Sequence, residues 1–599
     1  MMHSACGLDC YDACRIVAES TSPFKIHGDK SHPAGNGALC ALLNKAIHEA
    51  TRIETPRING QEVSMDEAIA AVVEAFKCER SLLWRGSGNV GVMQSVTDLF
   101  IEKIGGTLTK GSLCDGAGEA GILAGRGINR TLPLEQIKKA DTVVIWGRNI
   151  TVTNAHLMPY LEGKKIVVID PVRTAIAKKA DFHLQIKPRT DYYMAIMLAR
   201  FIFMESSEDI EWMEEFAPDF ADFYDYTREH RIKAILEYMG VGLGDMGRML
   251  DYLRDQKVVF IVGTGVQKYS IGSSVLHAID SLAATLGLFG KEGCGVSYLG
   301  NSKGGFDNPF AVKCPRVSKV TTPFSKFDTV LVQGGNPAES MPDSLHVCEE
   351  LERVENLIYF GLYENETSKR AKIVIPAKNF FEKEDVRLSY GHQYVEEMHK
   401  IQESSIGISE YELTQRLFEA FGFEGLHSKE HYLEFWLDQC KKDEEGNLLS
   451  PAYEELPYEE GFGEEGGEEF VFIDEYDDDF INTKRFRKYR KESKNKPKDE
   501  TFWLLSPKSS KALNTQFARS NKVELHPELG YIEGQKVILS SEYGSHEFIV
   551  SLNEDVRSDC VLITNNTFGL NKLTPSIVSE EGENACYQEV KVIINKDEE

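Results

Sequence analysis

The sequence has no excess of basic residues, no long apolar run and no recognisable targeting signal. Its 67 Lys and Arg residues are outnumbered by 94 Asp and Glu residues, which gives a formal net charge of −27. Phosphate binding needs clustered Lys and Arg, so we do not expect nucleic acid as a partner. No run approaches the ~18 apolar residues of a membrane span. The start, MMHSACGLDC, lacks a basic or apolar signal segment and a twin arginine. We therefore expect a cytoplasmic protein, unless a partner subunit carries an export signal.

Twelve cysteines are present among the 599 residues. A chain of this length predicts three to five domains, and cysteines of a large cytosolic protein stay reduced. Four of them follow the spacing C-x3-C-x3-C-x25-C, at Cys6, Cys10, Cys14 and Cys40. Thiolate sulfur in a four-cysteine set is typical of an iron–sulfur cluster, and we predict a [4Fe-4S] cluster. Zinc, or no metal, remains the alternative; the scattered cysteines are expected to be small buried hydrophobes.

Several apolar segments end in Gly, Asn or Asp and alternate with helical stretches. They predict open parallel α/β sheets, which bind ligands at the carboxyl ends of their strands. So many such ends indicate one large, extended ligand or several ligands. The expected strands lie in 82–89, 141–149, 164–174, 257–267, 328–337 and 356–367.

The region 441–500 has a different composition. It is acidic and Gly-rich through EEGFGEEGGEEF and DEYDDDF, and then basic in KRFRKYRKESKNKPK. This pattern is typical of a solvated linker or a partner-binding insertion. From residue 501 onward, short strands separated by turns predict a small all-β module, which we interpret as a barrel.

Taken in order, these motifs give the chain a specific resemblance to a known family. WGRN, VVIDPVRT, KPRTD, GTGVQ, QGGNPAES, NETSKRAKIVIPA and VELHPELGYIEGQKV follow the cysteine segment along the chain. The sequence resembles the molybdopterin-dependent oxidoreductases of the dimethyl-sulfoxide-reductase type through nearly its whole length except 441–500.

The resemblance implies a multidomain α/β fold. It comprises a small N-terminal cluster domain, two interleaved parallel-sheet α/β domains and a C-terminal six-stranded β-barrel. The expected domains are residues 1–54, 55–440 and 501–599, with 441–500 as an insertion. The implied cofactors are the [4Fe-4S] cluster and Mo or W held by two molybdopterin guanine dinucleotides.

The resemblance also implies roles for individual residues. Cys114, in GSLCDGAGEAG, falls where the family supplies its protein ligand to the metal, and Asp115 would ligate, carry protons or cap a helix. His156 is a candidate proton relay near the metal. The residues expected to hold the dinucleotides and pterins are Gly147, Asn149, Asp170, Arg173, Thr174, Asp191, Gly263, Gly265, Gly335, Asn336 and Asn514.

Three departures from the family pattern bear on function. The family usually places Lys two residues after the fourth cysteine, where this chain has Leu42, and Lys45 lies three residues further on. The family's PGTD motif reads Pro-Arg-Thr-Asp here, with Arg189 in the place of glycine. The loop after Cys114 also lacks the histidine of formate dehydrogenases, which disfavours formate oxidation.

The expected function is two-electron redox chemistry of a small molecule, with electrons passing through the cluster to an electron-transfer protein or subunit. A non-redox hydratase on the same fold is one alternative, and Leu42 would suit it. A non-catalytic electron-transfer or structural subunit of a respiratory complex is the other.

Overall fold

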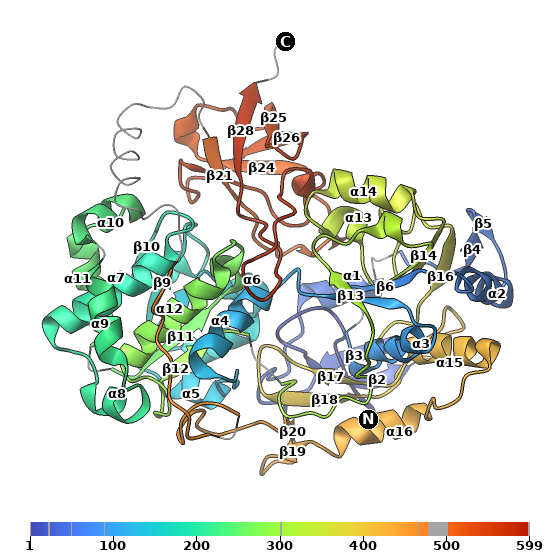
Figure 1. The fold of residues 1–599 in the computed structure, drawn as a ribbon, viewed down its shortest axis with the longest axis horizontal. Helices are drawn as coiled ribbons and strands as arrows, with labels where there is room; N and C mark the ends of the chain where they lie inside the picture. The colour runs from blue at the N-terminus through green and yellow to red at the C-terminus, as the bar shows by residue number, and fades with distance from the viewer. Residues whose placement is uncertain are drawn as a thin grey trace.

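The computed structural model describes residues 2–596 apart from 22–23, 49–50, 89, 230, 255, 300–301, 465 and 477–500. Two parallel sheets lie side by side, with the C-terminal barrel above the junction between them (Figure 1). The predicted fold class is confirmed, including the interleaving of the two α/β units. Among the described residues, no helix is both long and apolar enough to cross a membrane.

The larger sheet has eight strands in the order β13-β7-β6-β14-β15-β16-β4-β5. Neighbouring strands are parallel from β13 to β16 and antiparallel from β16 to β5. The inner strands are buried along their length, as expected where helices cover both faces of a parallel sheet. The strands are β4 (Arg57–Ile58), β5 (Gln61–Glu62), β6 (Ser81–Arg85), β7 (Thr107–Lys110), β13 (Arg316–Ser318), β14 (Thr329–Gln333), β15 (Asn356–Gly361) and β16 (Ile373–Pro376).

The smaller parallel sheet is inserted in sequence between β7 and β13. Its order is β10-β9-β8-β11-β12, with β8 and β11 buried at the centre. The strands are β8 (Thr142–Trp146), β9 (Lys165–Ile169), β10 (Phe182–Leu184), β11 (Val258–Val262) and β12 (Gly295–Ser297).

Helices cover both sheets. α7 and α12 are apolar almost all round because they lie inside the layer beside the five-stranded sheet, where α12 contacts both α4 and α7. The helices that precede β12 in the chain are α1 (Ala41–His48), α2 (Met65–Ala75), α3 (Thr97–Lys103), α4 (Gly116–Arg126), α5 (Leu134–Lys139), α6 (Ile150–Thr153), α7 (Asp191–Glu205), α8 (Ile210–Phe216), α9 (Phe220–Arg228), α10 (Ile232–Met239), α11 (Leu243–Leu253) and α12 (Gly272–Thr285). The helices that follow β12 are α13 (Pro337–Ser340), α14 (Ser344–Glu352), α15 (Glu410–Phe421) and α16 (Lys429–Leu437).

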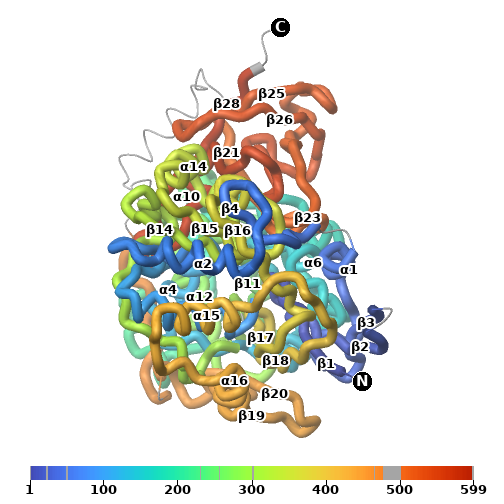
Figure 2. The backbone as a smooth tube through the Cα atoms, turned by 90° about the vertical axis from the view of Figure 1, so that its right-hand side faces the viewer, coloured from blue at the N-terminus to red at the C-terminus, as the bar shows by residue number. Residues whose placement is uncertain are grey.

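The N-terminal cysteine segment packs against a second antiparallel sheet. Strands β1 (Met2–Ala5), β2 (Arg15–Thr21) and β3 (Phe24–Gly28) form one small sheet, and β1 contacts β18 of the other. Figure 2 shows β1–β3 beside β17 and β18. The second sheet has the order β17-β18-β20-β19, formed by β17 (Asp385–Leu388), β18 (Tyr394–Met398), β19 (Lys441–Lys442) and β20 (Leu448–Leu449).

The C-terminal module is a closed barrel of six strands in the order β21-β27-β24-β26-β25-β28. Closure leaves no sheet edge unpaired, and this confirms the predicted six-stranded barrel. The barrel strands are β21 (Thr501–Leu505), β24 (Lys522–Leu525), β25 (Lys536–Ser540), β26 (Ser545–Leu552), β27 (Cys560–Leu562) and β28 (Lys591–Lys596). The hairpin β22 (Ala512–Leu513) and β23 (Gln516–Phe517) lies outside it.

The described part of 441–500 differs from the solvated loop that its composition suggested. Tyr458, Phe462, Phe470 and Phe472 are buried in the same core as α7 and α12. The ring of Phe462 lies 5.6 Å from Phe289 and 6.1 Å from Trp212. Acidic residues dominate the composition of the segment, but its aromatic side chains pack into this core and hold the segment against it. The basic run 484–498 lies outside the described residues.

Candidate active site

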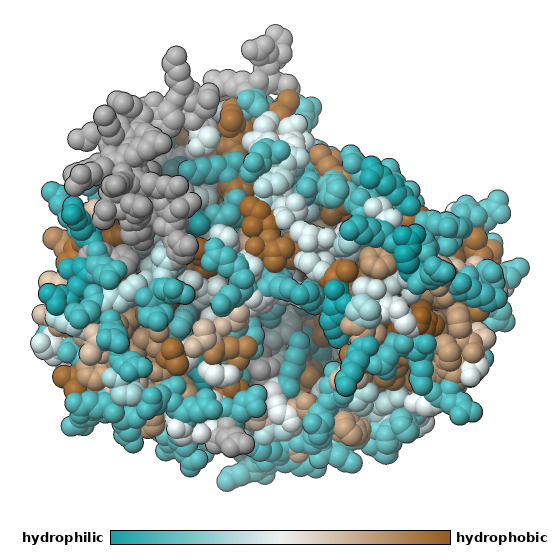
Figure 3. All heavy atoms as spheres, viewed as in Figure 1, coloured by the Kyte–Doolittle hydropathy of each residue, from teal (hydrophilic) through white to brown (hydrophobic). Residues whose placement is uncertain are grey.

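A cavity of about 1490 Å³ lies where the carboxyl ends of both parallel sheets meet the barrel. It exceeds the roughly 300–1,000 Å³ of ordinary ligand pockets, so it suits a very large ligand. The face drawn in Figure 3 is hollowed near its centre, below the barrel and between the two α/β halves. The predicted residues that line this central cavity are Cys114, Asp115, Gly147, Asn149, Asp170, Arg173, Thr174, Asp191, Gly265, Gly335, Asn336 and Asn514.

Of the residues predicted for the metal and pterin site, two do not line the central cavity. Gly263 packs beneath it, because a Cβ there would lie 2.2 Å from the carbonyl oxygen of Gly147. Its role is to let the ends of β8 and β11 approach each other closely. His156 lies against the N-terminal cysteines instead, with Nε2 3.9 Å from Cys14 Sγ.

The turn that carries Cys114 is held by a dense set of hydrogen bonds. Ser112 Oγ accepts from the backbone N–H groups of Cys114 at 2.9 Å and Asp115 at 3.1 Å, and it donates to Asp115 Oδ1 at 2.8 Å. Lys268 Nζ donates to the carbonyl oxygens of Leu113 at 2.9 Å and Cys114 at 2.6 Å. These contacts fix the Cys114 side chain at the wall of the cavity.

Asp115 is the N-cap residue of α4, but its carboxylate caps no helix amide. The Cys114 thiol is exposed to the cavity rather than to the outer surface. Burial raises the pKa of Cys114, and the Asp115 carboxylate adds to the shift while Lys268 and Lys508 oppose it. A bound metal would supply the positive charge that keeps this thiol deprotonated.

Asp170 and Asp191 are buried carboxyls at the strand ends of the smaller sheet. Burial, together with the nearby Asp191 carboxylate, raises the pKa of Asp170 to about 7. Burial also raises the pKa of Asp191 to about 6, although Trp146 Nε1 donates to its Oδ1 at 2.8 Å. Hydroxyl or guanine N–H donors of a ligand would give these carboxyls the partners that burial denies them.

Arg189 occupies a backbone conformation that favours glycine. Its φ of 67° lies in the left-handed region, at the position where the family has glycine. The ion pair between its guanidinium and Glu589 of the C-terminal domain, at 2.8 Å, offsets the energetic cost of this backbone conformation. The substitution therefore ties the smaller sheet to the C-terminal domain.

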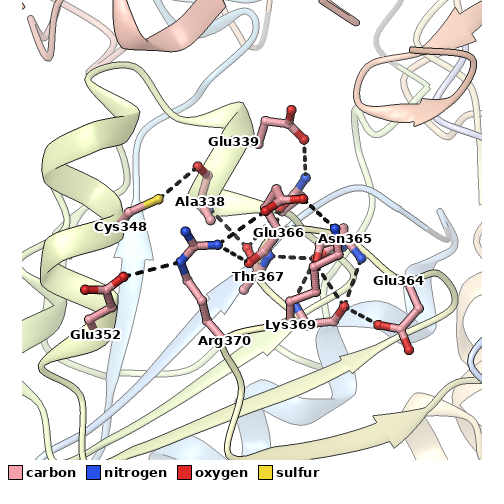
Figure 4. A network of polar contacts seen from close by, with 12 residues as sticks. Ala338, Glu339, Cys348, Glu352, Glu364, Asn365, Glu366, Thr367, Lys369 and Arg370 are labelled. Carbon is pink, nitrogen blue, oxygen red and sulfur yellow. Dashed lines mark hydrogen bonds and ion pairs between the residues drawn. The ribbon is translucent and has the colours of Figure 1, made fainter. Parts of the chain in front are cut away.

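At the larger sheet, Asn336 is held by the turn that follows β15. Thr367 Oγ1 donates to Asn336 Oδ1 at 3.0 Å and accepts from the N–H of Ala338 at 3.1 Å. Figure 4 shows this turn, in which Arg370 donates to the carbonyl oxygen of Glu366 at 2.8 Å. The network makes the Asn336 end of the cavity rigid.

The cavity wall is basic although the chain is acidic. Lys and Arg residues that line it outnumber Asp and Glu residues by twelve to eight. Lys508 is half-buried there; desolvation opposes its charged form, but Asp9, Cys114 and Tyr11 outweigh that effect and raise its pKa. Burial lowers the pKa of Lys319 to about 8, and Arg85 adds to the shift. Such a wall fits a ligand with several negative charges, as pyrophosphate groups would provide.

The four N-terminal cysteines lie together and form no disulfide. Burial raises the pKa of Cys6 to about 12, and Cys40 adds to the shift. Burial likewise raises the pKa of Cys14, with contributions from Cys6, Cys10 and Cys40. In the described part of the chain, no three His, Cys, Asp or Glu side chains converge closely enough for a single metal ion. Four cysteine thiols are the donor set that an iron–sulfur cluster takes.

Two positions near the cysteines bear on the expected electron path. Leu42 packs into the apolar cluster around Cys6, Cys14 and Cys40, so no cation replaces the family lysine there. Lys45 reaches the cavity wall, but its Nζ donates to the carbonyl oxygen of Lys511 at 3.0 Å.

Several site residues were not singled out from the sequence. Gln267 and Lys268 end the short helical turn after β11, so the GTGVQ motif, which finishes at Gln267, was the signal that could have found them. Asp9 lines the cavity and accepts from Asn514 Nδ2 at 3.2 Å. Lys508 and Arg387 carry no local sequence signal, because the fold brings them in from distant segments.

The chain belongs to the molybdopterin oxidoreductase family, whose model matches residues 52–406. It is 26% identical to the probable oxidoreductase YoaE of Bacillus subtilis (strain 168) over 70% of this chain and 68% of that protein. It is 24% identical to the F420-dependent formate dehydrogenase subunit alpha of Methanocaldococcus jannaschii, over 63% of each chain. Acetylene hydratase from Pelobacter acetylenicus shares the fold over 100% of both chains, with a TM-score of 0.80 and 14% identity.

Proposed function

We propose that this protein is a molybdenum- or tungsten-dependent oxidoreductase that carries out two-electron chemistry on a small molecule. The observation that carries the proposal is the position of Cys114, held rigidly at the wall of a large basic cavity between two sheets and a barrel. When bound, the metal and its two pterin dinucleotides supply the redox chemistry. The chain supplies ligation, orientation and the exclusion of bulk water.

The residues around the cavity divide this work. Cys114 would ligate the metal, while Gln267 and Lys268 hold its turn in place. Gly147, Asn149, Asp170, Arg173, Thr174 and Asp191 would hold one dinucleotide, and Gly265, Gly335, Asn336 and Asn514 would line the pterin or pyrophosphate paths. The glycines among them leave room for the close approach of the backbone.

The four cysteines would hold a [4Fe-4S] cluster that passes single electrons to or from a partner protein. Cys10 lies beside the cavity, because its neighbours in the chain, Asp9 and Tyr11, both line it. Lys508 is a half-buried cation near both Cys10 and Cys114, and it would offset the absence of lysine at position 42. A curated relative named assimilatory nitrate reductase catalytic subunit makes nitrate the first compound to test. Formate comes second, because another relative is named formate dehydrogenase subunit alpha but the loop after Cys114 lacks the histidine of those enzymes.

Elemental analysis of the purified protein tests the proposal most directly. We expect about four irons per chain, together with Mo or W and acid-releasable guanine nucleotide. The cluster should be bleached by dithionite and restored by the correct electron acceptor. Iron without Mo, W or guanine nucleotide would contradict the proposed enzyme and favour a non-catalytic electron-transfer subunit.

A non-redox hydratase is the second candidate, and the apolar surroundings of Leu42 favour it. A hydratase needs no electron supply during turnover, so the lysine that the family places at position 42 is dispensable. Product formation from water and an unsaturated substrate, without any electron acceptor and with an unchanged cluster spectrum, would identify it. Steady-state reduction of the cluster by substrate would exclude it.

A further inference from the structure

Arg387 is a buried cation that touches the backbone of the cysteine segment. It lies in β17, and 1% of its surface is exposed. Its Nε donates to the carbonyl oxygen of Cys6 at 3.2 Å, and its Nη2 donates to those of Leu8 at 3.2 Å and Cys10 at 2.9 Å. Its Nη1 donates to the carbonyl oxygen of Leu388 at 2.5 Å. Every acceptor is a neutral carbonyl, and no described carboxylate lies within ion-pair distance of Arg387.

This arrangement is unusual even within the same protein. Four arginines are buried in the described part of the chain. Arg126 pairs with Asp280 at 2.7 Å, and Arg189 pairs with Glu589 at 2.8 Å. Arg148 has no carboxylate partner, but it lines the basic cavity that suits an anionic ligand. Arg387 is the other buried arginine without such a partner among these residues.

A buried charge without an opposite charge costs several kcal/mol, so a stable fold needs a counter-charge near it. The acceptors of Arg387 identify where that charge must lie, because two of them belong to Cys6 and Cys10. Four thiolates around an iron–sulfur cluster give that group a net negative charge.

We propose that Arg387 is the charge partner of the four-cysteine cluster and raises its reduction potential. The inference rests on the proposed function, because it requires the cluster. Reduction by dithionite adds one electron to the oxidised cluster, and Arg387 keeps its charge and its proton. A fixed cation in a low-dielectric interior stabilises the more negative, reduced form more strongly than the oxidised form. Arg387 is thus a positioning residue with an electrostatic role, since it touches the turns around the cysteines rather than the reacting atoms.

Redox titration followed by electron paramagnetic resonance tests the proposal on the intact holoprotein. In Arg387→Gln, which removes the charge, we expect the midpoint potential of the cluster to shift to a lower value. In Arg387→Lys, which keeps the charge but not the forked geometry, we expect a potential close to that of the wild type. The double variant Arg52→Gln/Glu382→Gln is the matched control. Arg52 and Glu382 form an ion pair at 2.6 Å. The double variant removes one positive and one negative charge together, so the midpoint potential of the cluster should not change.

Each result has a defined meaning. An unchanged potential in Arg387→Gln overturns the proposal, as does an Arg387→Lys potential shifted as far as that of Arg387→Gln. If Arg387→Gln fails to retain iron, Arg387→Lys decides: retained iron at the wild-type potential supports the charge role, and lost iron overturns it. Wild-type protein without iron overturns the proposed cluster itself, which separates that failure from a failure of the Arg387 proposal.

Discussion

The side-chain amide of Gln267 joins the Cys114 turn to the first turn of the helix that follows it. Gln267 Nε2 donates to the carbonyl oxygen of Cys114 at 2.6 Å, and its Oε1 accepts from the N–H of Gly118 at 3.0 Å. Gln267 is fully buried. One amide therefore fixes the cysteine relative to α4, and it does so from the strand end of the other sheet.

Gln267→Leu should weaken the enzyme without unfolding it. The leucine fills similar space but leaves the Cys114 carbonyl and the Gly118 N–H without this partner. Loss of a residue that orients a metal ligand typically costs 10–100-fold in activity or metal affinity, and we expect about that loss. Specific activity and Mo or W content per chain measure it.

Gln136→Leu is the matched control for Gln267→Leu. Gln136 is equally buried and also uses both ends of its amide, on the Glu455 carbonyl at 2.9 Å and the Gly293 N–H at 2.9 Å. Its amide contacts no residue of the Cys114 turn, so its variant should lose stability but retain activity per folded molecule. Equal losses of activity in both variants would mean that Gln267 acts only through stability.

Cys114→Ala should abolish activity and leave the absorbance of the cluster intact. The thiol is the candidate metal ligand, whereas the cluster cysteines lie in a separate segment. Activity assays and visible spectra of the same preparation measure the two effects. Cys78→Ala is the control, because Cys78 donates to Thr329 Oγ1 at 3.4 Å at the opposite end of β14 and lies outside the cavity. If Cys114→Ala also lost the absorbance of the cluster, Cys114 would belong to the cluster site and not to the proposed metal site.

The strand ends were the most predictable part of the site. Glycine, Asn and Asp after buried runs identified Gly147, Asp170 and Asn336, because parallel strands present their carboxyl ends at one edge. His156 was expected near the metal from its place after β8. The structure puts it at Cys14, because the short helical segment after β8 turns toward the N-terminal cysteines.

Other features could not be predicted because they depend on contacts between distant segments. Arg387 reaches residues 377 to 381 positions earlier in the chain, and the sequence of β17 carries no sign of this. The position of Lys508 depends on how the barrel docks over the sheets. The acidic composition of 441–476 predicted a solvated segment, but four buried aromatic residues pack it against the core.

The buried carboxyl of Asp170 predicts a pH-dependent stability of the cofactor-free protein. Its pKa in the folded protein is about 7, above the ordinary value of 3.8. Folding therefore favours the neutral form of Asp170. The stability that this preference contributes to the folded protein is fully present below about pH 4 and is lost as the pH rises through 7. We expect the unfolding temperature of the apoprotein to fall between pH 5 and pH 8.

Asp170→Asn should remove this part of the pH dependence and stabilise the apoprotein at pH 8. Differential scanning fluorimetry across that range measures the effect. Asp181→Asn is the control, because Asp181 is an exposed carboxylate at the edge of the same sheet. Parallel pH profiles of the wild type and Asp170→Asn would show that another group is responsible.

Phe462→Ala should destabilise the smaller α/β unit, because the described part of 441–476 belongs to its core. Phe462 is fully buried, and its ring stacks on Tyr458 at 5.1 Å. Tyr458 Oη in turn accepts from the N–H of Arg130 at 2.8 Å and donates to the Ile128 carbonyl at 2.9 Å. Removing a buried phenyl ring costs about 3–5 kcal/mol, which corresponds to a fall of roughly 6 °C or more in the unfolding temperature of a unit this size. Val471→Ala in the same segment should change little, because Val471 is 58% exposed. A solvated loop would instead tolerate both substitutions equally, so matching thermal transitions for the two variants would contradict the packed segment.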